Sequence, residues 1–415
     1  MRPSPYLQSA RRVALPLLGI PLLLAAVACS GTPSDPGFGS QENNSSGGAS
    51  SGGNSSGGNS SGGNSSGGNG SSGGLTGGSS GGGGSSGGGD SGAQGPVDVL
   101  PACDTGLAVD GDAFSFAKAM GICAASTQSG YGLVNATYSR AYGSTNPPAD
   151  GQWGLLPNFG ILAPREGASL GVISSGFGRA YDDASGTDQG MNGWFVAGNP
   201  MDGMNYPTGV APPGFPQAAQ GCPQDNKVND MVDVQLTLKA PPDASGFQFD
   251  FAFFSSEWPN YVCSNFNDAF VAYLNSSQTK GNISFDSKGN PVAVNIGFLD
   301  VCTPGAPIGC SRSNGNQPDP PLSTSVCASG TAQLSDTGFA PTDQTQCDGS
   351  NVNATLGAST GWLTTVAPIQ PGEQFTLDLM IWDAGDGLLD SSVLLDHFQW
   401  IGGTPVSAPV TQPAQ

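Results

Sequence analysis

Phe247-Gln-Phe-Asp-Phe-Ala-Phe-Phe254 is the stretch of sequence that decides the fold class. Phe247, Phe249, Phe251 and Phe253 recur with a period of two, so an extended chain places all four rings on one face. Aromatic residues also favour strands over other elements. The stretch therefore predicts a β-strand that lies against a large hydrophobic core.

The same period of two recurs on both sides of this strand. Residues 232–238, 292–298 and 375–381 each alternate apolar and other side chains, and in 232–239 the alternation with Asp, Gln, Thr and Lys predicts a half-buried strand. Residues 269–274 are apolar on both faces, which predicts a central strand, and 392–401 form a last apolar strand. Loops rich in Pro, Gly, Asn and Asp separate these runs. The fold class is therefore mostly β, an antiparallel β-sandwich or jelly-roll-like domain.

One short helix is expected near the start of this domain. Asp112 is a suitable N-cap, residues 113–120 are compatible with a helix, and Gly121 suits the position after its end. Residues 167–176 contain a short strand, and the proline cluster at 207–216 indicates a loop.

The first 28 residues have the pattern of an export signal. Basic Arg2, Arg11 and Arg12 precede an apolar stretch at 13–28 that is too short and too interrupted to span a bilayer. Ala26-Val-Ala-Cys29 resembles a bacterial lipobox, which implies lipid attachment at Cys29. Alanine stands where this motif usually has leucine, so an ordinary signal peptide cut near residue 28 is the alternative. Ser30 resembles the outer-membrane class of such lipoproteins.

A low-complexity segment separates the signal from the folded region. Residues 43–95 are almost wholly Gly, Ser and Asn and cannot form a core, so we expect 29–96 to be a disordered tether that follows the lipid attachment at Cys29. A Gly-rich coil of about 65 residues spans roughly 45 Å. The expected folded domain is 97–403, with an N-terminal extension at 97–229 and a core at 230–403, and 404–415 is expected to be a disordered tail.

Charge and composition narrow the class of partner. The formal net charge is −20, from 12 basic and 32 acidic residues. This charge balance disfavours nucleic acid and anionic membrane surfaces as partners, because phosphate binding needs clustered Lys and Arg. The expected membrane contact is therefore through the lipid anchor only. One histidine and the absence of any Cys-x-x-Cys make a zinc site a poor explanation of the sequence.

Eight cysteines remain when Cys29 is set aside, and an even number in an exported chain implies disulfides. We expect the pairs Cys103–Cys123 and Cys222–Cys263. Two further bridges are expected among Cys302, Cys310, Cys327 and Cys347. Residues 302–347 lack strand alternation, and cross-links would stabilise such an irregular segment.

Two acidic segments follow the ends of strong strands and are candidates for a metal site. One runs from Ser255 to Phe270 and the other from Asp383 to Asp390. Loops that leave one end of a sandwich converge, and Ca²⁺ prefers carboxylate and carbonyl oxygens. The candidate Ca²⁺ ligands are Glu257, Asp268, Asp383, Asp386 and Asp390. The alternative is that they are solvated loop acids or residues of Asx turns.

Enzymatic activity is not expected. The only histidine, His397, lies in an apolar strand, and no Gly-x-Ser-x-Gly elbow is present. The remaining catalytic alternative is a glycoside-acting hydrolase that uses Glu257 and Asp383, because that chemistry needs only two carboxylates. Trp258 and Tyr261 would then stack on sugars, whereas the competing interpretation of Trp258 is packing.

Several separated motifs resemble the choice-of-anchor L domain of bacterial surface proteins. They occur in order across residues 230–401: Ser256-Glu-Trp-Pro259, Asn267-Asp-Ala-Phe270, Asn282-Ile283, Pro291-Val-Ala-Val-Asn295, Gly361-Trp-Leu-Thr-Thr365, Pro371-Gly372, and the acidic signature from Asp383 to Asp396. The resemblance implies a β-sandwich surface domain without enzymatic activity, and residues 103–222 are similar to the N-terminal extension of its lipoprotein members.

These observations lead to one expected function and two alternatives. We expect an exported protein, lipid-anchored at the outer membrane or cell surface, whose domain is a binding or adhesion module for a glycan or a surface protein, with Ca²⁺ shaping the loops. The alternatives are a structural envelope lipoprotein without a ligand and the glycoside-acting hydrolase.

Overall fold

The computed structural model describes residues 100–179, 209–296, 298–310, 320–339, 357–387 and 389–415, and it also places five short strands between these ranges. The export signal, the lipid-attachment residue Cys29 and the tether expected for residues 1–96 lie outside the described residues.

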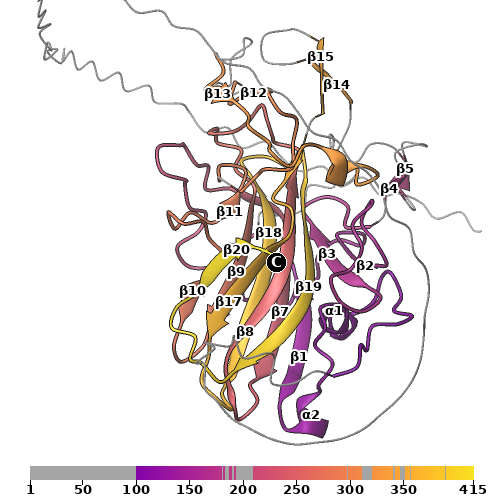
Figure 1. The fold of residues 1–415 in the computed structure, drawn as a ribbon, viewed down its shortest axis with the longest axis vertical. Helices are drawn as coiled ribbons and strands as arrows, with labels where there is room; N and C mark the ends of the chain where they lie inside the picture. The colour runs from indigo at the N-terminus through magenta and orange to yellow at the C-terminus, as the bar shows by residue number, and fades with distance from the viewer. Residues whose placement is uncertain are drawn as a thin grey trace, which may run out of the picture. The chain divides into compact units, whose positions relative to one another are not determined.

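Two antiparallel sheets form the domain, as the sequence predicted (Figure 1). We call the first the β7 sheet. Its strand order is β1 (Gly132–Ser139), β7 (Val228–Lys239), β18 (Gln374–Ala384), β9 (Ala269–Asn275) and β10 (Lys280–Asn282), and β11 (Val292–Ala293) also pairs with β9. We call the second the β8 sheet. Its order is β2 (Trp153–Leu156), β3 (Leu170–Ser174), β19 (Ser391–Gly402), β8 (Ala244–Ser255), β17 (Leu363–Pro368) and β20 (Val410–Pro413), and β16 (Ala358–Ser359) also pairs with β8.

Smaller elements complete the described chain. The helices are α1 (Ala113–Ala119), α2 (Ser126–Ser129) and the 3₁₀ turn η1 (Ala332–Leu334). There are three small sheets. In the first, β5 (Thr187–Asp188) pairs with both β4 (Tyr181–Asp182) and β6 (Met191–Asn192); in the others, β12 (Pro307–Ile308) pairs with β13 (Ser323–Thr324) and β14 (Thr342–Thr345) with β15 (Asn351–Thr355).

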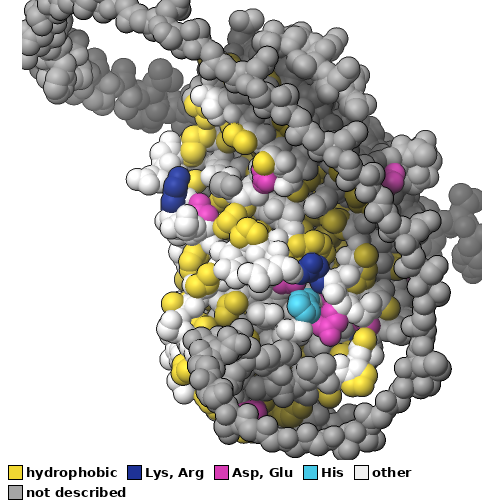
Figure 2. Space-filling view, viewed as in Figure 1, with side chains coloured by type: hydrophobic (Ala, Val, Ile, Leu, Met, Phe, Trp, Pro, Cys, Tyr) yellow, Lys and Arg dark blue, Asp and Glu magenta, His cyan; other side chains and the backbone are white. Residues whose placement is uncertain are grey.

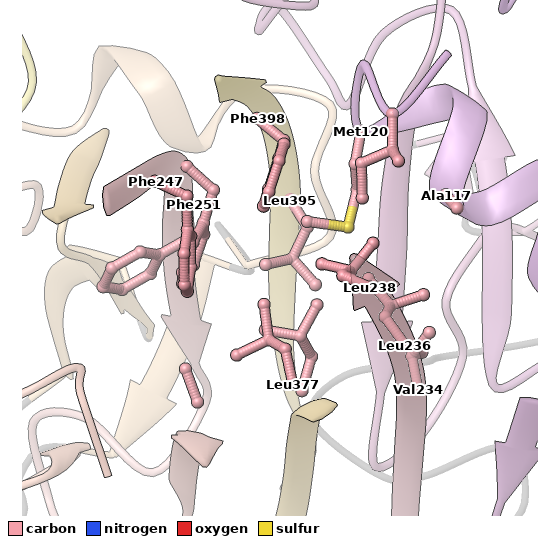
Figure 3. Close-up of a cluster of buried hydrophobic side chains, with 14 of the residues drawn as sticks. Ala117, Met120, Val234, Leu236, Leu238, Phe247, Phe251, Leu377, Leu395 and Phe398 are labelled. Atoms are coloured by element: carbon pink, nitrogen blue, oxygen red, sulfur yellow. The ribbon is translucent and has the colours of Figure 1, made fainter. Parts of the chain in front are cut away.

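The core lies between the two sheets and is built by the alternating residues of the central strands. Phe247 of β8 stacks on Phe375 of β18 and on Phe398 of β19, each with ring centroids 5.4 Å apart. Figure 3 shows side chains of β7, β18 and β19 pointing toward one another beside Met120, which follows α1. The four phenylalanines at 247, 249, 251 and 253 are fully buried, which explains why this stretch specifies the sandwich.

The part of 97–229 that was expected to be an N-terminal extension supplies strands to both sheets of the sandwich. β1 pairs with β7, and β2 and β3 extend the β8 sheet. Helix α1 begins after Asp112, whose Oδ1 accepts a hydrogen bond of 2.8 Å from the backbone N–H of Ser115, as the sequence predicted. Phe116 is fully buried, so α1 seals one flank of the core.

Three expectations from the sequence are wrong. The strand expected at 292–298 is only the two residues of β11, because a turn follows Ala293. The tail expected to be disordered at 404–415 contains β20, which pairs with β17 over four residue pairs. The strand expected to be half-buried at 232–239 is buried on both faces around Asp233, which is 1% exposed because the outward face of the β7 sheet is covered at that point.

Three disulfides lie within the described residues. Cys103–Cys123 and Cys222–Cys263 are the pairs expected from the sequence, and Cys302–Cys327 joins two of the last four cysteines. Cys310 is also disulfide-bonded. Cys347 lies outside the described residues.

Candidate functional site

At one end of the sandwich, the inward-facing positions of the central strands change from apolar to polar. Two residues beyond the buried Ile381, β18 places Asp383, and two residues beyond Phe253, β8 ends at Ser255. Two residues before Phe270 of β9 stands Asp268. Because successive side chains of a strand alternate between faces, these polar groups continue the core-facing series. We call the acidic residues at this end of the sandwich the acidic layer. They are Asp268, Asp383, Glu257, Asp386, Asp390 and Asp230.

Asp268 accepts hydrogen bonds on both of its carboxylate oxygens. Its Oδ2 accepts a hydrogen bond of 2.7 Å from the hydroxyl of Ser391, and its Oδ1 accepts one of 3.1 Å from the backbone N–H of Ala384. Burial raises the pKa of Asp268 to about 7, and these two hydrogen bonds limit the rise. Asp268 thus joins both sheets at this end of the core.

Glu257 and Asp383 are buried with fewer partners. They are 2% and 1% exposed. Within the described residues, Oε2 of Glu257 and both carboxylate oxygens of Asp383 have no hydrogen-bond partner. No Lys, Arg or His of that part of the chain forms a salt bridge with either. Unpartnered buried oxygens of this kind mark a place where a charge-compensating group is favourable.

The charge effects on the pKa values of Glu257 and Asp383 indicate that the five predicted ligands lie near one another. Burial raises the pKa of Glu257 well above its usual value, and the charges of Asp268, Asp386 and Asp390 raise it further. Burial also raises the pKa of Asp383, with added repulsion from Asp268 and Asp390. Residues separated by more than 120 positions in sequence therefore share one electrostatic environment, as the sequence predicted for loops that leave one end of a sandwich.

Asp390 requires a glycine in the segment that follows β3. A Cβ atom built on Gly176 would lie 1.8 Å from Oδ2 of Asp390, so no other residue fits there without displacing the carboxylate. Asp390 is 2% exposed, whereas Asp386 is partly exposed and its backbone carbonyl accepts a hydrogen bond of 2.5 Å from the side chain of Asn229.

Asp230 is a member of the acidic layer that the sequence analysis missed. Its charge raises the pKa of Asp383, so the two carboxylates are close. Asp230 has a positive φ of 49°, at an irregularity in the pairing of β7 with β18. The signal that could have found it is its position two residues before Val232, in the inward-facing series of β7.

A disulfide-linked segment packs against Trp258, the residue after Glu257. Trp258 is 4% exposed and packs in one hydrophobic cluster with Cys302, Ala306, Cys327 and Ala358. Trp258 therefore packs and does not stack on a sugar. Burial of Glu257 and Asp383 also disfavours the glycoside-hydrolase alternative, because a catalytic pair has to reach a glycosidic bond.

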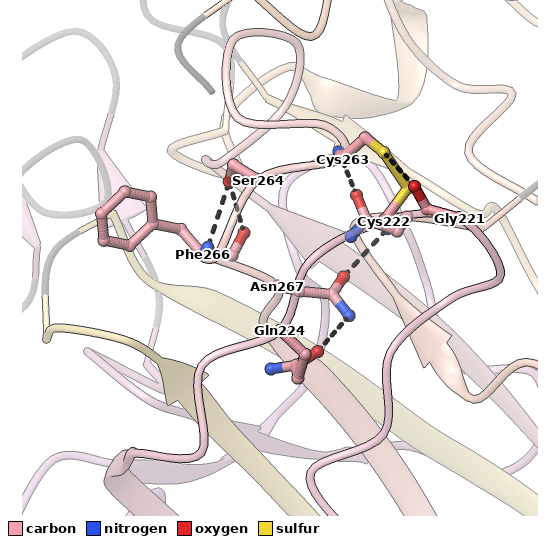
Figure 4. Close-up of a disulfide and its surroundings, with 8 residues drawn as sticks. Gly221, Cys222, Gln224, Cys263, Ser264, Phe266 and Asn267 are labelled. Atoms are coloured by element: carbon pink, nitrogen blue, oxygen red, sulfur yellow. Dashed lines mark hydrogen bonds between the residues drawn. A yellow bond between two sulfur atoms is a disulfide. The ribbon is translucent and has the colours of Figure 1, made fainter. Parts of the chain in front are cut away.

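Amide side chains hold the loop between Glu257 and Asp268 in place (Figure 4). Asn267 donates a hydrogen bond of 2.9 Å to Gln224 and accepts one of 3.1 Å from the backbone of Asn295. Asn295 in turn accepts from the backbone N–H of Cys263, which is bridged to Cys222. The ring of Tyr261 meets that of Phe266 edge-on at 5.4 Å, and both are partly exposed.

The acidic layer is not a ready-made coordination sphere. Among the described residues, no group of three or more His, Cys, Asp or Glu side chains is disposed to hold a metal ion as it stands. The chemistry nevertheless fits a hard cation, because the donors are carboxylate oxygens and several of them lack partners.

His397 lies away from the acidic layer, in a second polar network on the outward face of the β8 sheet. Its Nδ1 lies 2.9 Å from Oδ2 of Asp250, and the same oxygen accepts a hydrogen bond of 3.0 Å from Nε of Arg165. In Figure 2 the only histidine of the chain is visible at the surface beside basic and acidic side chains. The histidine therefore belongs to a surface network with both charge signs, and no nucleophile hydrogen-bonds to it among the described residues.

The chain was compared with families of known proteins. The family model of the Choice-of-anchor L domain matches residues 217–399. No curated protein matches the chain. The matched family is a non-catalytic family of surface-associated β domains, and the matched range contains every member of the acidic layer. None of the helices in the described part of the chain is long and apolar enough to cross a membrane.

Proposed function

We propose that this chain is a lipid-anchored cell-surface protein whose sandwich is a binding or adhesion module, with Ca²⁺ held by Glu257, Asp268, Asp383, Asp386 and Asp390. The observation that carries the proposal is the convergence of five carboxylates, four of them at most 2% exposed, at one end of the core. Like charges buried together need compensation, and a divalent cation supplies it.

Ca²⁺ would act here by drawing the loops together. The acids come from three places: the segment after β8, the residue before β9, and the end of β18 together with the segment between β18 and β19. An ion bound to all three would order the partly exposed surface at Tyr261, Phe266 and Asp386, where a glycan or a surface protein would bind. The pairing of Tyr261 with Phe266 supports this location, because aromatic rings at a rim suit either ligand.

A thermal melt tests the metal. The full chain carrying Cys29→Ser, which removes the lipid, is melted in EDTA and in Ca²⁺. Truncation at residue 403 is avoided because β20 pairs with β17. We expect Ca²⁺ to raise the melting temperature, since Ca²⁺ at 100 times its Kd adds about 2.7 kcal/mol. Asp383→Asn should reduce the Ca²⁺-dependent rise, and Asp243→Asn, at an exposed turn, should not. Equal melting temperatures in EDTA and Ca²⁺ would remove the metal from the proposal.

Two further measurements test the anchor and the binding role. Cys29→Ser should release the protein from the membrane fraction and abolish labelling by a fatty-acid analogue. A glycan array and whole-cell adhesion, each with and without EDTA, test the module, and binding should be lost with chelator. Binding that persists unchanged in EDTA would contradict a Ca²⁺-dependent module. Self-association without any ligand would favour the structural envelope alternative.

A further inference from the structure

A disulfide fastens the loop between β8 and β9, which carries two acids of the acidic layer. Cys222, in the segment before β7, is bridged to Cys263, in this loop. Both cysteines are partly exposed, whereas Cys302 and Cys327 of another disulfide are 0% and 4% exposed. Because thiol–disulfide exchange requires access of a thiolate to a sulfur atom, a reductant reaches Cys222–Cys263 more easily than Cys302–Cys327.

Hydrogen bonds and the disulfide form a closed ring at this loop (Figure 4). The backbone N–H of Cys263 donates to Oδ1 of Asn295, whose own backbone N–H donates a hydrogen bond of 3.1 Å to Oδ1 of Asn267. Nδ2 of Asn267 donates one of 2.9 Å to Gln224, two residues after Cys222. Asn267 is 1% exposed, so its hydrogen bonds are shielded from water. The ring therefore connects the disulfide firmly to Asn267.

The same ring holds the backbone at Asp268. Asn267 immediately precedes Asp268. The carbonyl of Asp268 accepts a hydrogen bond of 3.2 Å from the backbone N–H of Val294, which immediately precedes Asn295. A binding site needs its ligating groups held within about 0.5 Å of the required geometry. Loss of the ring would therefore affect the placement of one of the five proposed Ca²⁺ ligands.

The backbone of Cys263 adopts a conformation that needs support from its surroundings. Its φ is 61°, in the left-handed region that residues other than glycine rarely adopt. Such conformations persist only where the surrounding structure holds them. The disulfide and the hydrogen bond to Asn295 both act on this residue. Opening the disulfide removes one of these two restraints, so the loop is free to relax.

We propose that the Cys222–Cys263 disulfide is a redox control of the Ca²⁺ site in the acidic layer, and that a dithiol reductant weakens Ca²⁺ binding by opening it. This inference rests on the proposed function, because it concerns the regulation of the same site. The dithiol supplies two electrons and two protons: the S–S bond is replaced by the thiols of Cys222 and Cys263, and the dithiol becomes a cyclic disulfide. The freed loop then holds the carboxylate of Asp268 less precisely, so the ion loses a well-placed ligand.

The redox state and Ca²⁺ binding are linked in both directions. Loss of a supporting group at a metal site lowers affinity by about 10-fold or more, and we expect about 10-fold here. Saturating Ca²⁺ must then favour the disulfide over the two thiols by the same factor. For this two-electron couple a factor of 10 corresponds to about 30 mV. Ca²⁺ should therefore lower the reduction potential of Cys222–Cys263 by that amount, a shift that a disulfide without influence on the site would not show.

A redox titration of the full chain carrying Cys29→Ser measures this shift. The protein is equilibrated in graded dithiothreitol buffers with either EDTA or saturating Ca²⁺, the thiols are trapped by alkylation, and each disulfide is quantified by mass spectrometry. The Cys103–Cys123 pair, which is also partly exposed, is the internal control and should have the same potential in both buffers. Equal potentials of Cys222–Cys263 in EDTA and in Ca²⁺ would overturn the proposal.

Calorimetric titration with Ca²⁺ compares two pairs of cysteine variants in the same Cys29→Ser chain. Cys222→Ser with Cys263→Ser should bind Ca²⁺ about 10-fold more weakly than this parent chain, whereas Cys103→Ser with Cys123→Ser should bind it equally well. If both double variants bind as tightly as the parent, the redox control fails and the Ca²⁺ site stands. If the parent itself binds no Ca²⁺, the proposed function fails and the redox control fails with it.

Asn295→Ala keeps the disulfide and replaces the cysteine variants if these fail to fold. It removes the oxygen that accepts the hydrogen bond from Cys263, and so opens the ring. Ca²⁺ binding should weaken, and the shift that Ca²⁺ causes in the potential of Cys222–Cys263 should fall well below about 30 mV. Asn275→Ala, at the exposed end of β9, is the matched control and should change neither. An undiminished shift in Asn295→Ala would overturn the ring as the connection between the disulfide and the Ca²⁺ site.

Discussion

The hydroxyl of Ser391 donates a hydrogen bond of 2.7 Å to Oδ2 of Asp268, across 123 residues of sequence. Ser391 is the first residue of β19 in the β8 sheet, and Asp268 immediately precedes β9 in the β7 sheet. Both side chains are fully buried. This polar contact thus connects the two sheets where the apolar core ends and the acidic layer begins.

Removing this hydroxyl should destabilise the fold. Ser391→Ala leaves one oxygen of a buried carboxylate without its donor, which typically costs about 1–3 kcal/mol. Urea unfolding measures the change, and Ser287→Ala, at an exposed turn position, is the control that should stay within about 0.5 kcal/mol of the wild type. Equal unfolding midpoints for Ser391→Ala and the wild type would show that this contact contributes nothing to stability.

Gly176 should tolerate no side chain while Asp390 is present. In Gly176→Ala the new methyl group would overlap the Asp390 carboxylate, and such overpacking destabilises by about 1–3 kcal/mol. Asp390→Ala removes that carboxylate, so the double variant should lose less than the sum of the two single variants. Strict additivity in urea unfolding would contradict the contact.

Arg165 should secure the C-terminal strand β20. Its Nη2 donates a hydrogen bond of 2.7 Å to the carbonyl of Gln415, while its Nε pairs with Asp250. The side chain of Arg165 is 30% exposed, so we expect Arg165→Ala to destabilise the pairing of β20 by only about 1 kcal/mol. Amide exchange at residues 410–413 should then be about fivefold faster. Arg179→Ala breaks a pair with the exposed Asp150 and should leave these amides unchanged. Equal exchange rates in both variants would contradict the role of Arg165.

The stabilising contribution of His397 should depend on pH. Its hydrogen bond to Asp250 raises the pKa of His397, and the charges of Asp250, Glu166 and Asp396 act in the same direction, while partial burial opposes them. A raised pKa in the folded state means that the contribution is complete below the unfolded value of about 6.5 and is lost as pH rises through the folded value.

The measurement for His397 is the difference in unfolding free energy between the wild type and His397→Gln from pH 5.5 to 8.5. The advantage of the wild type should be largest at the acidic end. Asp396 also titrates in this range, because burial raises its pKa to about 7. That carboxyl is retained in both proteins, so its effect should largely cancel in the difference. Parallel pH profiles would show that His397 gains nothing from its acidic neighbours.

Much of the architecture was predictable because it follows from local periodicity. The alternation at 247–254 and 375–381 predicted two central strands. The apolar run at 269–274 predicted β9, and Asp112 predicted the start of α1. Expectations failed where tertiary pairing overrides local pattern. β20 forms only because β17 offers an open edge, and the alternation at 292–298 stops after two residues because the chain turns.

For the candidate site too, some features follow from local sequence and others only from the tertiary structure. Sequence alone determined which acids follow the ends of strong strands, since strand ends and turn residues are local features. Only the tertiary structure decided that those acids are buried, that Asp230 joins them, and that hydrogen bonds tie the Cys222–Cys263 disulfide to the residue before Asp268. The physical reason is that burial and charge repulsion depend on what packs against a side chain, and the packing partners here come from distant parts of the chain.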